Sequence, residues 1–362
     1  MITSDLRHAI TRAVAAAGYQ QAKDPGLRPA GAPGGYAASV ALTLGPNPRE
    51  SAETLARSLA EEPWIATAEV TGIGYLTISV TPEALSAVAG KVIKAGPACV
   101  MSDALAGTPV PAAPVGDPLA APTWEKARAA LAARLTARLA AAAGATVAAF
   151  PNSERPRVSP RACTDRGAGE TRIRSEDPDA GPDAEPQERD VPAAVAFAGR
   201  DAVLFTLARA IPGKPLRVDP EIIARHVLGN PAYAVRYAHA RAASGLRWAV
   251  TSSAAVTPGT EAALPCPPAD PGELALLDAL SWLPERVATA ARRGRPDEFA
   301  RYLEDLASVT VDVLSSASHP AAGAAPGSDR LTLATAARTA LAAGLSLLEV
   351  SAPERLLAQT YL

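Results

Sequence analysis

The sequence predicts a mainly α-helical protein with a small α/β domain at its amino terminus and an antiparallel helical bundle at its carboxyl terminus. Three observations lead to this fold class. Alanine is abundant, and aromatic residues make up only 4% of the 362 residues, which favours closely packed helices. Short β-like runs gather in the first part of the chain, whereas helical periodicity dominates the last part. The hydrophobic content of 48% is sufficient for a sizeable core.

Residues 1–95 are expected to form the α/β domain. Its predicted elements are a helix over 3–17, an apolar stretch at 36–44 that suits either a helix or a strand, a helix from Pro48, two β-like runs at 65–70 and 75–80, and a helix opened by Thr81 and Pro82. In the first helix, Leu6, Ile10 and Val14 recur at helical spacing. The two β-like runs are separated by a Gly-containing turn at 71–74, which predicts a hairpin.

The middle of the chain, residues 96–198, offers little regular structure. Its first part is rich in Pro and Ala and is interpreted as a linker. One long helix is expected over 123–143, followed by a short strand at 146–150. Residues 165–190 hold nine acidic residues against four arginines and almost nothing apolar. Such a segment cannot offset its ordering entropy, so we expect a disordered acidic linker.

Residues 199–362 are predicted to form the helical bundle, because short and medium connections between successive helices favour antiparallel neighbours. The expected helices lie near 199–210, 219–228, 231–249, 272–292, 297–316 and 330–348.

Charge and cysteine content exclude several classes of protein. The formal net charge is −2, so no overall basic field is present, although a local basic patch remains compatible. Cys99, Cys163 and Cys266 are far apart and form no CxxC pair, so we expect neither disulfides nor a metal site. The sequence starts without an apolar signal region and has no membrane-spanning run. We therefore expect a cytoplasmic monomer without membrane contact.

Three segments of the second half resemble arginyl-tRNA synthetases. NPAYAVRYAHAR at Asn230–Arg241 is similar to the family's NPxxYxQYAHAR. The run 274–308, with RPDEFARYLEDLAS, resembles its anticodon-binding helices. ALAAGLSLLEVSAPER at Ala340–Arg355 resembles its closing VLxxGLxLLGISAPERM. Together they resemble the DALR anticodon-binding domain of these class I synthetases, and residues 199–223 resemble the stretch after the second catalytic motif.

The amino-terminal domain resembles the family's D-arm-binding module. GGYAASVAL at 34–42 is similar to GDYATNVAL, and GIGYLTI at 72–78 is similar to GPGFLNI. Gly35, Ser39 and Thr77 stand where the family has other polar residues. The resemblance therefore implies the fold of the module, with weakened tRNA contacts.

The catalytic motifs of the family are missing from the sequence. Class I synthetases stabilise the charge that develops on ATP with a HIGH-type histidine pair and a KMSKS-type lysine. The four histidines, at positions 8, 226, 239 and 319, include no pair within one helical turn, and Lys214 is the only lysine after Lys126. About a hundred residues between the recognisable ends are too few for a parallel nucleotide-binding sheet. We expect a degenerate remnant of the catalytic domain, with no catalytic residue and no cofactor.

The resemblance implies a noncatalytic tRNA-binding protein, with arginine tRNA as the natural ligand. Two other classes stay open. One is an arginine–tRNA ligase, or a subunit of one. The other is an adaptor that presents tRNA to a modifying or aminoacyl-transfer enzyme.

The candidate tRNA-binding side chains fall into two groups. Those on the anticodon side are Tyr233, Arg236, Tyr237, Arg241, Arg293, Arg301 and Arg355, and those on the D-arm side are Tyr36, Tyr75 and Thr77. Tyr233, Tyr237 and Arg241 are spaced four apart and share one helix face. There, the aromatic rings can stack on bases and the arginine can hold phosphate. The alternative is that both tyrosines belong to the core.

Other features have two interpretations. The arginines at 286, 292, 293, 295 and 301 could form a phosphate-binding patch or a solvated helix end. Tyr75 could face the D-loop or the core. His239 is interpreted as a hydrogen-bonded structural residue.

Overall fold

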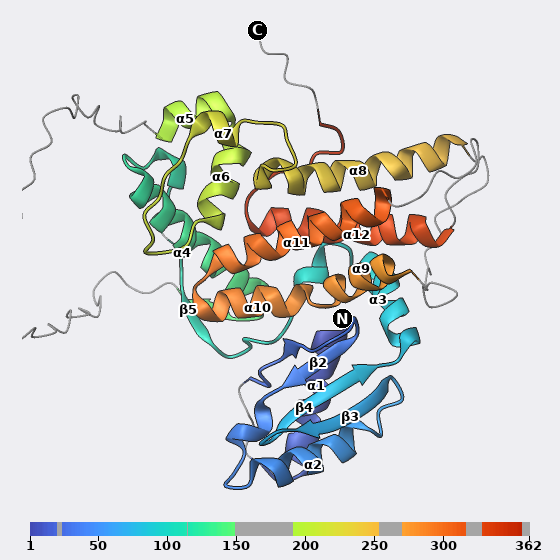
Figure 1. Cartoon of the computed structure of the whole chain (residues 1–362). Coiled ribbons are helices and arrows are strands. Elements are labelled where there is room, and N and C mark those ends of the chain that lie inside the picture. Colours follow the sequence, from blue (N-terminus) through green and yellow to red (C-terminus); the bar gives the residue numbers. More distant parts are fainter. Residues whose placement is uncertain (20–23, 114, 149–190, 253–269, 316–327, 357–362) are drawn as a thin grey trace, which may run out of the picture.

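The computed structural model shows the α/β domain at one end of the molecule and the helices packed against it (Figure 1). The expected fold class is confirmed, because helices dominate and the larger sheet lies near the amino terminus. The predicted acidic linker, 165–190, lies outside the described residues. The structure describes residues 1–19, 24–113, 115–148, 191–252, 270–315 and 328–356.

The first domain is a four-stranded antiparallel sheet in the order β1-β2-β4-β3 with three helices. Its elements are α1 (Ile2–Ala16), β1 (Arg28–Pro29), β2 (Gly35–Ala38), the 3-10 helix η1 (Val40–Thr43), α2 (Pro48–Leu59), β3 (Ile65–Thr71), β4 (Tyr75–Val80) and α3 (Pro82–Ala95). The predicted hairpin is confirmed by the pairing of β3 with β4. The ambiguous stretch at 36–44 is a strand followed by a 3-10 helix.

The sheet buries one face and leaves the other partly open. Leu76 and Ile78 are fully buried, whereas Tyr75 is 41% exposed and Thr77 is half-buried. This alternation follows from the period of two along a strand. The side chains of α1 that recur at helical spacing, among them Leu6, are buried in the core of this domain.

The middle segment contains more structure than a linker. Its described elements are η2 (Gly96–Val100), β5 (Pro109–Pro111), η3 (Pro118–Ala120), α4 (Trp124–Ala142) and β6 (Thr146–Ala148). Thr123 caps α4 by accepting a hydrogen bond from the backbone N–H of Lys126 at 3.3 Å. Strands β5 and β6 pair in parallel and form a separate two-stranded sheet.

Two prolines close the outer edge of β5. Thr146 N–H donates to the carbonyl of Thr108, which directs residues 108 and 110 toward β6. Pro109 and Pro111 therefore face the opposite edge, where neither can donate an N–H. A further strand cannot form a complete hydrogen-bond ladder on that side.

The remaining described helices build the bundle. They are α5 (Val191–Ala198), α6 (Arg200–Arg209), α7 (Pro220–Ile223), α8 (Pro231–Ser252), α9 (Pro271–Ser281), α10 (Leu283–Arg293), α11 (Pro296–Ser315) and α12 (Ser328–Leu347). Helices α8, α11 and α12 pack on one another, and α4 packs on α10 (Figure 1).

Two helix predictions need correction. The helix expected over 272–292 is broken at Trp282 into α9 and α10. Pro284 lies in the first turn of α10, and a proline cannot donate the hydrogen bond that would continue the preceding helix. The helix expected over 219–228 is limited to the four residues of α7.

The α/β domain packs directly against the bundle through polar contacts. The hydroxyl of Tyr36 lies 2.8 Å from that of Ser281, and Gly34 N–H donates to the carboxylate of Asp278 at 2.9 Å. Thr3 donates to the carbonyl of Ser281 at 2.7 Å. The ring of Tyr36 also packs on Trp282, with centroids 5.1 Å apart. The break between α9 and α10 therefore lies at the contact between the two parts, to which α3 also contributes by packing on α9 and α12.

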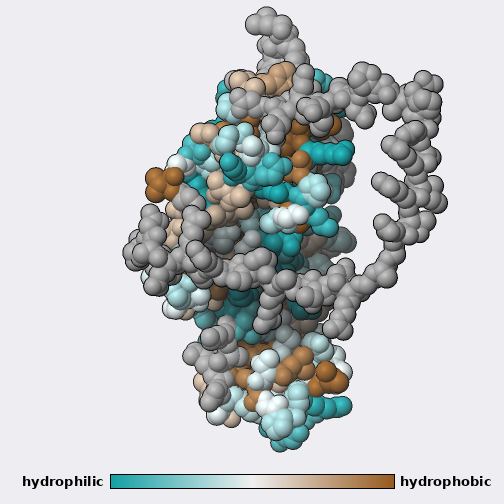
Figure 2. Space-filling view, turned by 90° about the vertical axis from the view of Figure 1, so that its left-hand side faces the viewer, coloured by the Kyte–Doolittle hydropathy of each residue, from teal (hydrophilic) through white to brown (hydrophobic). Residues whose placement is uncertain are grey.

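Hydrophilic and hydrophobic residues are interspersed on the face shown in Figure 2. The largest exposed apolar side chains include Phe197, Ile222 and Leu228 near α5 and α7. Among the described helices, none is by itself long and apolar enough to cross a membrane, although the sharply bent pair α5 and α6 meets that length and composition test when taken together.

Candidate RNA interface

Asn230 organises the start of α8. Its Oδ1 accepts the N–H of Ala232 at 3.2 Å, and Pro231 occupies the first turn. Its Nδ2 donates to the carbonyls of Ile223 and Arg225 at 2.8 and 2.7 Å. An asparagine is a favoured helix cap because its oxygen satisfies a free N–H. Here the same side chain also folds the preceding loop back onto the helix.

This loop and α8 form an aromatic ladder on the surface. The ring of His226 stacks on Tyr233 with centroids 5.1 Å apart, and Tyr233 stacks on Tyr237 at 5.8 Å. His226 is exposed, and both tyrosines are half-buried. The ladder is therefore partly accessible to solvent, with Tyr233 stacked between the other two rings.

Arginines without acidic partners lie around the ladder. Arg241 follows Tyr237 by one turn on the same face of α8 and is exposed. Arg225, in the loop, and Arg355, near the last described residue, are exposed as well. Within the described part of the chain, none of the three forms an ion pair. Their charges are available to an anion.

A cleft of about 470 Å³ opens beside the ladder. His226, Tyr233 and Arg355 are among its lining residues, as are Asp201 and Arg236. Arg236 lies 3.2 Å from the carboxylate of Asp201, so its charge is already neutralised. Arg236 is half-buried. Arg236 is therefore held within the cleft by an ion pair, whereas Arg355 forms none within the described residues.

The turn after α12 forms one side of this cleft and is fixed at several points. Ser351 hydrogen-bonds to Asp201 through both its N–H, at 3.1 Å, and its hydroxyl. His239 Nδ1 donates to the carbonyl of Pro353 at 2.9 Å. Burial lowers the pKa of His239 below its usual value, and the hydrogen bond to Pro353 partly opposes this effect. The predicted structural role of His239 is confirmed by this bond.

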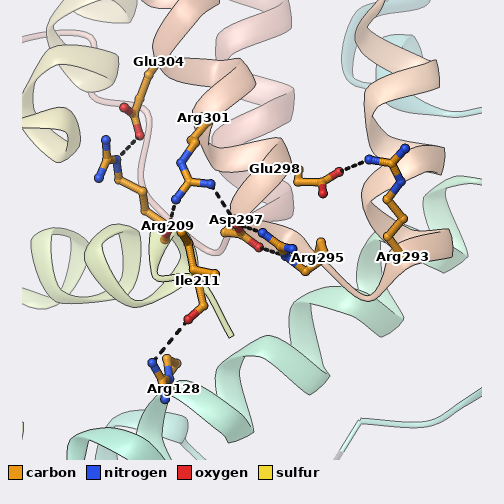
Figure 3. A network of polar contacts seen from close by, with 9 residues as sticks. All are labelled: Arg128, Arg209, Ile211, Arg293, Arg295, Asp297, Glu298, Arg301 and Glu304. Carbon is orange, nitrogen blue, oxygen red and sulfur yellow. Dashed lines mark hydrogen bonds and ion pairs between the residues drawn. The ribbon is translucent and has the colours of Figure 1, made fainter. Parts of the chain in front are cut away.

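The other predicted arginines do not line the cleft. Figure 3 shows Asp297 between Arg295 and Arg301, at 2.7 and 2.9 Å. Arg293 pairs with Glu298 at 3.1 Å.

Arg292 pairs with Asp24 at 2.6 Å, and Arg286 lies over the rings of Trp282 and Tyr302. The predicted phosphate-binding patch is thus not supported, because acidic or aromatic partners within the protein occupy all five arginines.

On the D-arm side, the prediction that Tyr36 contacts a ligand is wrong, whereas Tyr75 and Thr77 lie at the surface. Tyr36 is fully buried and cannot contact a ligand. The register pairs Tyr36 with Ile78 on the buried face, whereas Thr77 pairs with Ala37 on the other face. Tyr75 and Thr77 share this open face, where the Thr77 hydroxyl lies 3.2 Å from that of Thr71.

Sequence reasoning missed His226, Asp201 and Ser351 as parts of this site. Of the residues that build the site, Asn230 alone could be recognised from the local sequence, since an Asn-Pro pair before a helical pattern predicts a helix cap and hence an ordered loop. The other three come together from three separate segments. In the described residues, no group of three or more His, Cys, Asp or Glu side chains is arranged to hold a metal ion.

Comparisons with known proteins place α8, α11 and α12 within a known family of domains. A family model, the DALR anticodon binding domain, matches residues 235–356. The arginine–tRNA ligase of Acidithiobacillus ferrooxidans is 36% identical over 167 residues, which are 44% of this chain and 27% of that protein. The arginine–tRNA ligase of Frankia alni is 37% identical over 164 residues, 44% of this chain and 29% of that protein.

The match therefore spans less than a third of the length of these curated relatives. The structure of Thermus thermophilus arginyl-tRNA synthetase aligns with a TM-score of 0.64, covering 98% of this chain and 100% of that chain at 16% identity, which shows a shared fold. The chain is thus related to arginyl-tRNA synthetases and carries a DALR anticodon-binding domain in its carboxy-terminal part.

Proposed function

We propose that this protein binds tRNA through the exposed face of α8 and does not aminoacylate it. The observation that carries the proposal is the ladder of His226, Tyr233 and Tyr237 beside Arg241 and Arg355. Stacking on aromatic rings and unpaired arginine charge are the two contacts that single-stranded RNA loops need. The relationship to anticodon-binding domains supports an anticodon loop as the RNA element.

Each part of the chain has a role in this proposal. Residues 1–95 contact the D-arm through Tyr75 and Thr77 on the open face of the sheet. Residues 199–362 contact the anticodon stem-loop, and residues 96–198 are the remnant of a catalytic domain. Arginine tRNA is the proposed ligand because the sequence relatives are named arginine–tRNA ligases.

The placement of the described histidines and of Lys214 supports the proposal that the protein does not aminoacylate tRNA. His8 Nε2 lies 2.9 Å from the carboxylate of Asp103. His226 stacks on Tyr233, and His239 donates to the backbone carbonyl of Pro353. None of these described histidines pairs with another. Lys214 follows α6 in a loop whose carbonyls are held by Arg128. The proline edge of β5 also prevents extension of the small parallel sheet on that side.

Binding is tested with the full chain, mixed tRNA and single isoacceptors. We expect a preference for arginine isoacceptors, and we expect the Tyr233→Ala/Tyr237→Ala double variant to bind at least about tenfold more weakly, since each stacked base contributes about 1–3 kcal/mol. Arg293→Ala, which removes a charge already paired with Glu298, is the control. Equal and weak binding to all isoacceptors would contradict the specific form of the proposal.

Catalysis is tested by arginine-dependent exchange between ATP and pyrophosphate. We expect no exchange at high protein concentration, with or without added tRNA. Exchange above the background of a sample without arginine would establish the ligase alternative. Capture of a tRNA-dependent enzyme that is lost after ribonuclease treatment would instead support an adaptor.

A further inference from the structure

Glu349 adopts a backbone conformation that L-residues rarely take. Its φ is 61°, and no other non-glycine residue in the described ranges has a positive φ. It lies two residues after the end of α12 at Leu347. A left-handed residue at this place lets the chain reverse direction after the helix, but a Cβ atom makes that conformation unfavourable. Something else must therefore hold Glu349 there.

Two arginines of α4 supply the contacts. Arg134 Nε donates to the Glu349 carboxylate at 2.5 Å, and Arg138 Nη1 lies 3.7 Å from it. The carboxylate is only 11% exposed, so solvent screens the pair weakly. Arg138 also donates to the last carbonyls of α12, those of Ser346 and Leu347, at 2.8 and 3.3 Å. Helix α4 therefore caps α12 and fixes the residue that turns the chain.

The same middle segment also contacts Arg200, which lines the cleft. Arg134 Nη1 donates to the carbonyl of Gly116 at 3.0 Å. The next residue, Asp117, accepts two hydrogen bonds from Arg200, at 2.8 and 3.1 Å. Arg200 precedes Asp201, which binds the backbone and hydroxyl of Ser351. One segment thus anchors both the start of α6 and the turn that leads to Arg355.

We propose that Glu349 is a positioning residue for RNA binding and that α4 is the support on which the turn 348–356 is built. The inference rests on the proposed tRNA binding. The segment 96–198, which we propose is a remnant of a catalytic domain, then has a present role in holding this turn. Without the carboxylate, the turn keeps its path and its bonds to Asp201 and His239 but loses one of its anchors to α4, so Arg355 samples more positions beside the cleft.

The test compares Glu349→Gly, Arg134→Gln and the double variant in the full chain. Glycine accepts a positive φ without steric penalty, so Glu349→Gly removes the contact while retaining the turn. The control is Asp103→Asn in the middle segment, which removes an exposed contact with His8. Two quantities are measured: hydrogen exchange of the amides at 350–356 and the Kd for tRNA.

We expect each single variant to exchange faster at 350–356 and to bind tRNA about three- to tenfold more weakly. The double variant should weaken binding by less than the sum of the two single effects, because the two residues share one contact, although Arg134 also binds Gly116 and Glu349 also lies near Arg138. Thermal unfolding and the control should change little. A purely structural role would lower the unfolding temperature of Glu349→Gly and leave the Kd unchanged.

Unchanged exchange at 350–356 in both single variants, or faster exchange with an unchanged Kd, would overturn the inference. Absence of tRNA binding by the unmodified protein is a different result. It removes the proposed function, and with it the role of Glu349 in RNA binding, while the exchange data still decide whether α4 holds the turn.

Discussion

The guanidinium of Arg7 donates to the carboxylate of Glu285 across 2.5 Å, although 278 residues separate them in the sequence. Both side chains are buried, at 8% and 6% exposure. Arg7 lies on α1 and Glu285 on α10, so this contact ties the first helix of the α/β domain to the bundle. A second carboxylate, that of Asp24, lies 3.6 Å from Arg7.

We expect Glu285→Ala to lower the free energy of unfolding by about 3 kcal/mol, because Arg7 then loses its buried partner. Urea denaturation followed by circular dichroism measures this change. The exposed pair of Arg49 and Glu53 provides the matched control, since Arg49→Ala should change the free energy by less than about 1 kcal/mol. Equal effects of the two substitutions would mean that Asp24 replaces Glu285 fully.

Substitutions of Tyr36 and Tyr75 should affect different properties, the first stability and the second RNA binding. Tyr36→Phe removes a buried hydrogen bond to Ser281, so we expect a loss of about 1 kcal/mol in the free energy of unfolding and an unchanged Kd for tRNA. Tyr75→Ala, on the open face, should weaken tRNA binding and leave stability nearly unchanged. Weaker binding by Tyr36→Phe at full stability would contradict the placement of this residue.

Arg241 should contribute a phosphate contact and Arg293 should not. We expect Arg241→Ala to lower the slope of log K against log salt by about one, as the loss of one phosphate contact predicts. Arg293→Ala should leave the slope unchanged, because Glu298 already pairs with that residue. Titrations at several salt concentrations give both slopes, and equal slopes for the two variants would count against the α8 face.

His239 should make stability depend on pH. Its pKa in the folded protein is lowered by burial from 6.5, so the unfolded chain binds the proton more readily. Stability is therefore complete above about pH 6.5 and falls as the pH decreases toward the lowered pKa. Unfolding temperatures between pH 8 and pH 5 measure this trend, and we expect His239→Asn to flatten it. A trend of the same steepness in His239→Asn would assign it to other groups.

Cys99 should be unreactive in the folded protein. The thiol is 2% exposed, and burial raises its pKa to about 12, so little nucleophilic thiolate forms near neutral pH. We expect iodoacetamide to modify Cys99 only after unfolding in urea, as peptide mapping by mass spectrometry would show. Modification under native conditions would indicate that η2 opens readily.

The sequence predicted the positions of helices more accurately than the face of the sheet on which a side chain lies. Leucine and alanine periodicity is a local property, so most helices lie where it placed them. The face of Tyr36 depends on its pairing with Ile78, more than forty residues later, and no local pattern contains that register. The break at Trp282 has a local cause in Pro284, which the helical periodicity around it concealed.

In the candidate site too, features within one helix could be predicted, whereas contacts between distant segments could not. The spacing of Tyr233, Tyr237 and Arg241 predicted a shared face because one helix carries all three. The contacts of Asp201 with Ser351 join residues that are 150 positions apart. Such contacts depend on how helices pack, and the neutralisation of Arg293 and Arg301 by nearby acids depends on side-chain positions that composition does not reveal.

The prolines of β5 have a consequence beyond the fold. A free strand edge invites pairing with another polypeptide and is a common starting point for aggregation. At Pro109 and Pro111 this edge offers carbonyl groups without N–H donors, so a strand from another molecule finds no complete set of partners. The residues that stop the small sheet from growing within the chain also protect this edge in a crowded solution of other chains.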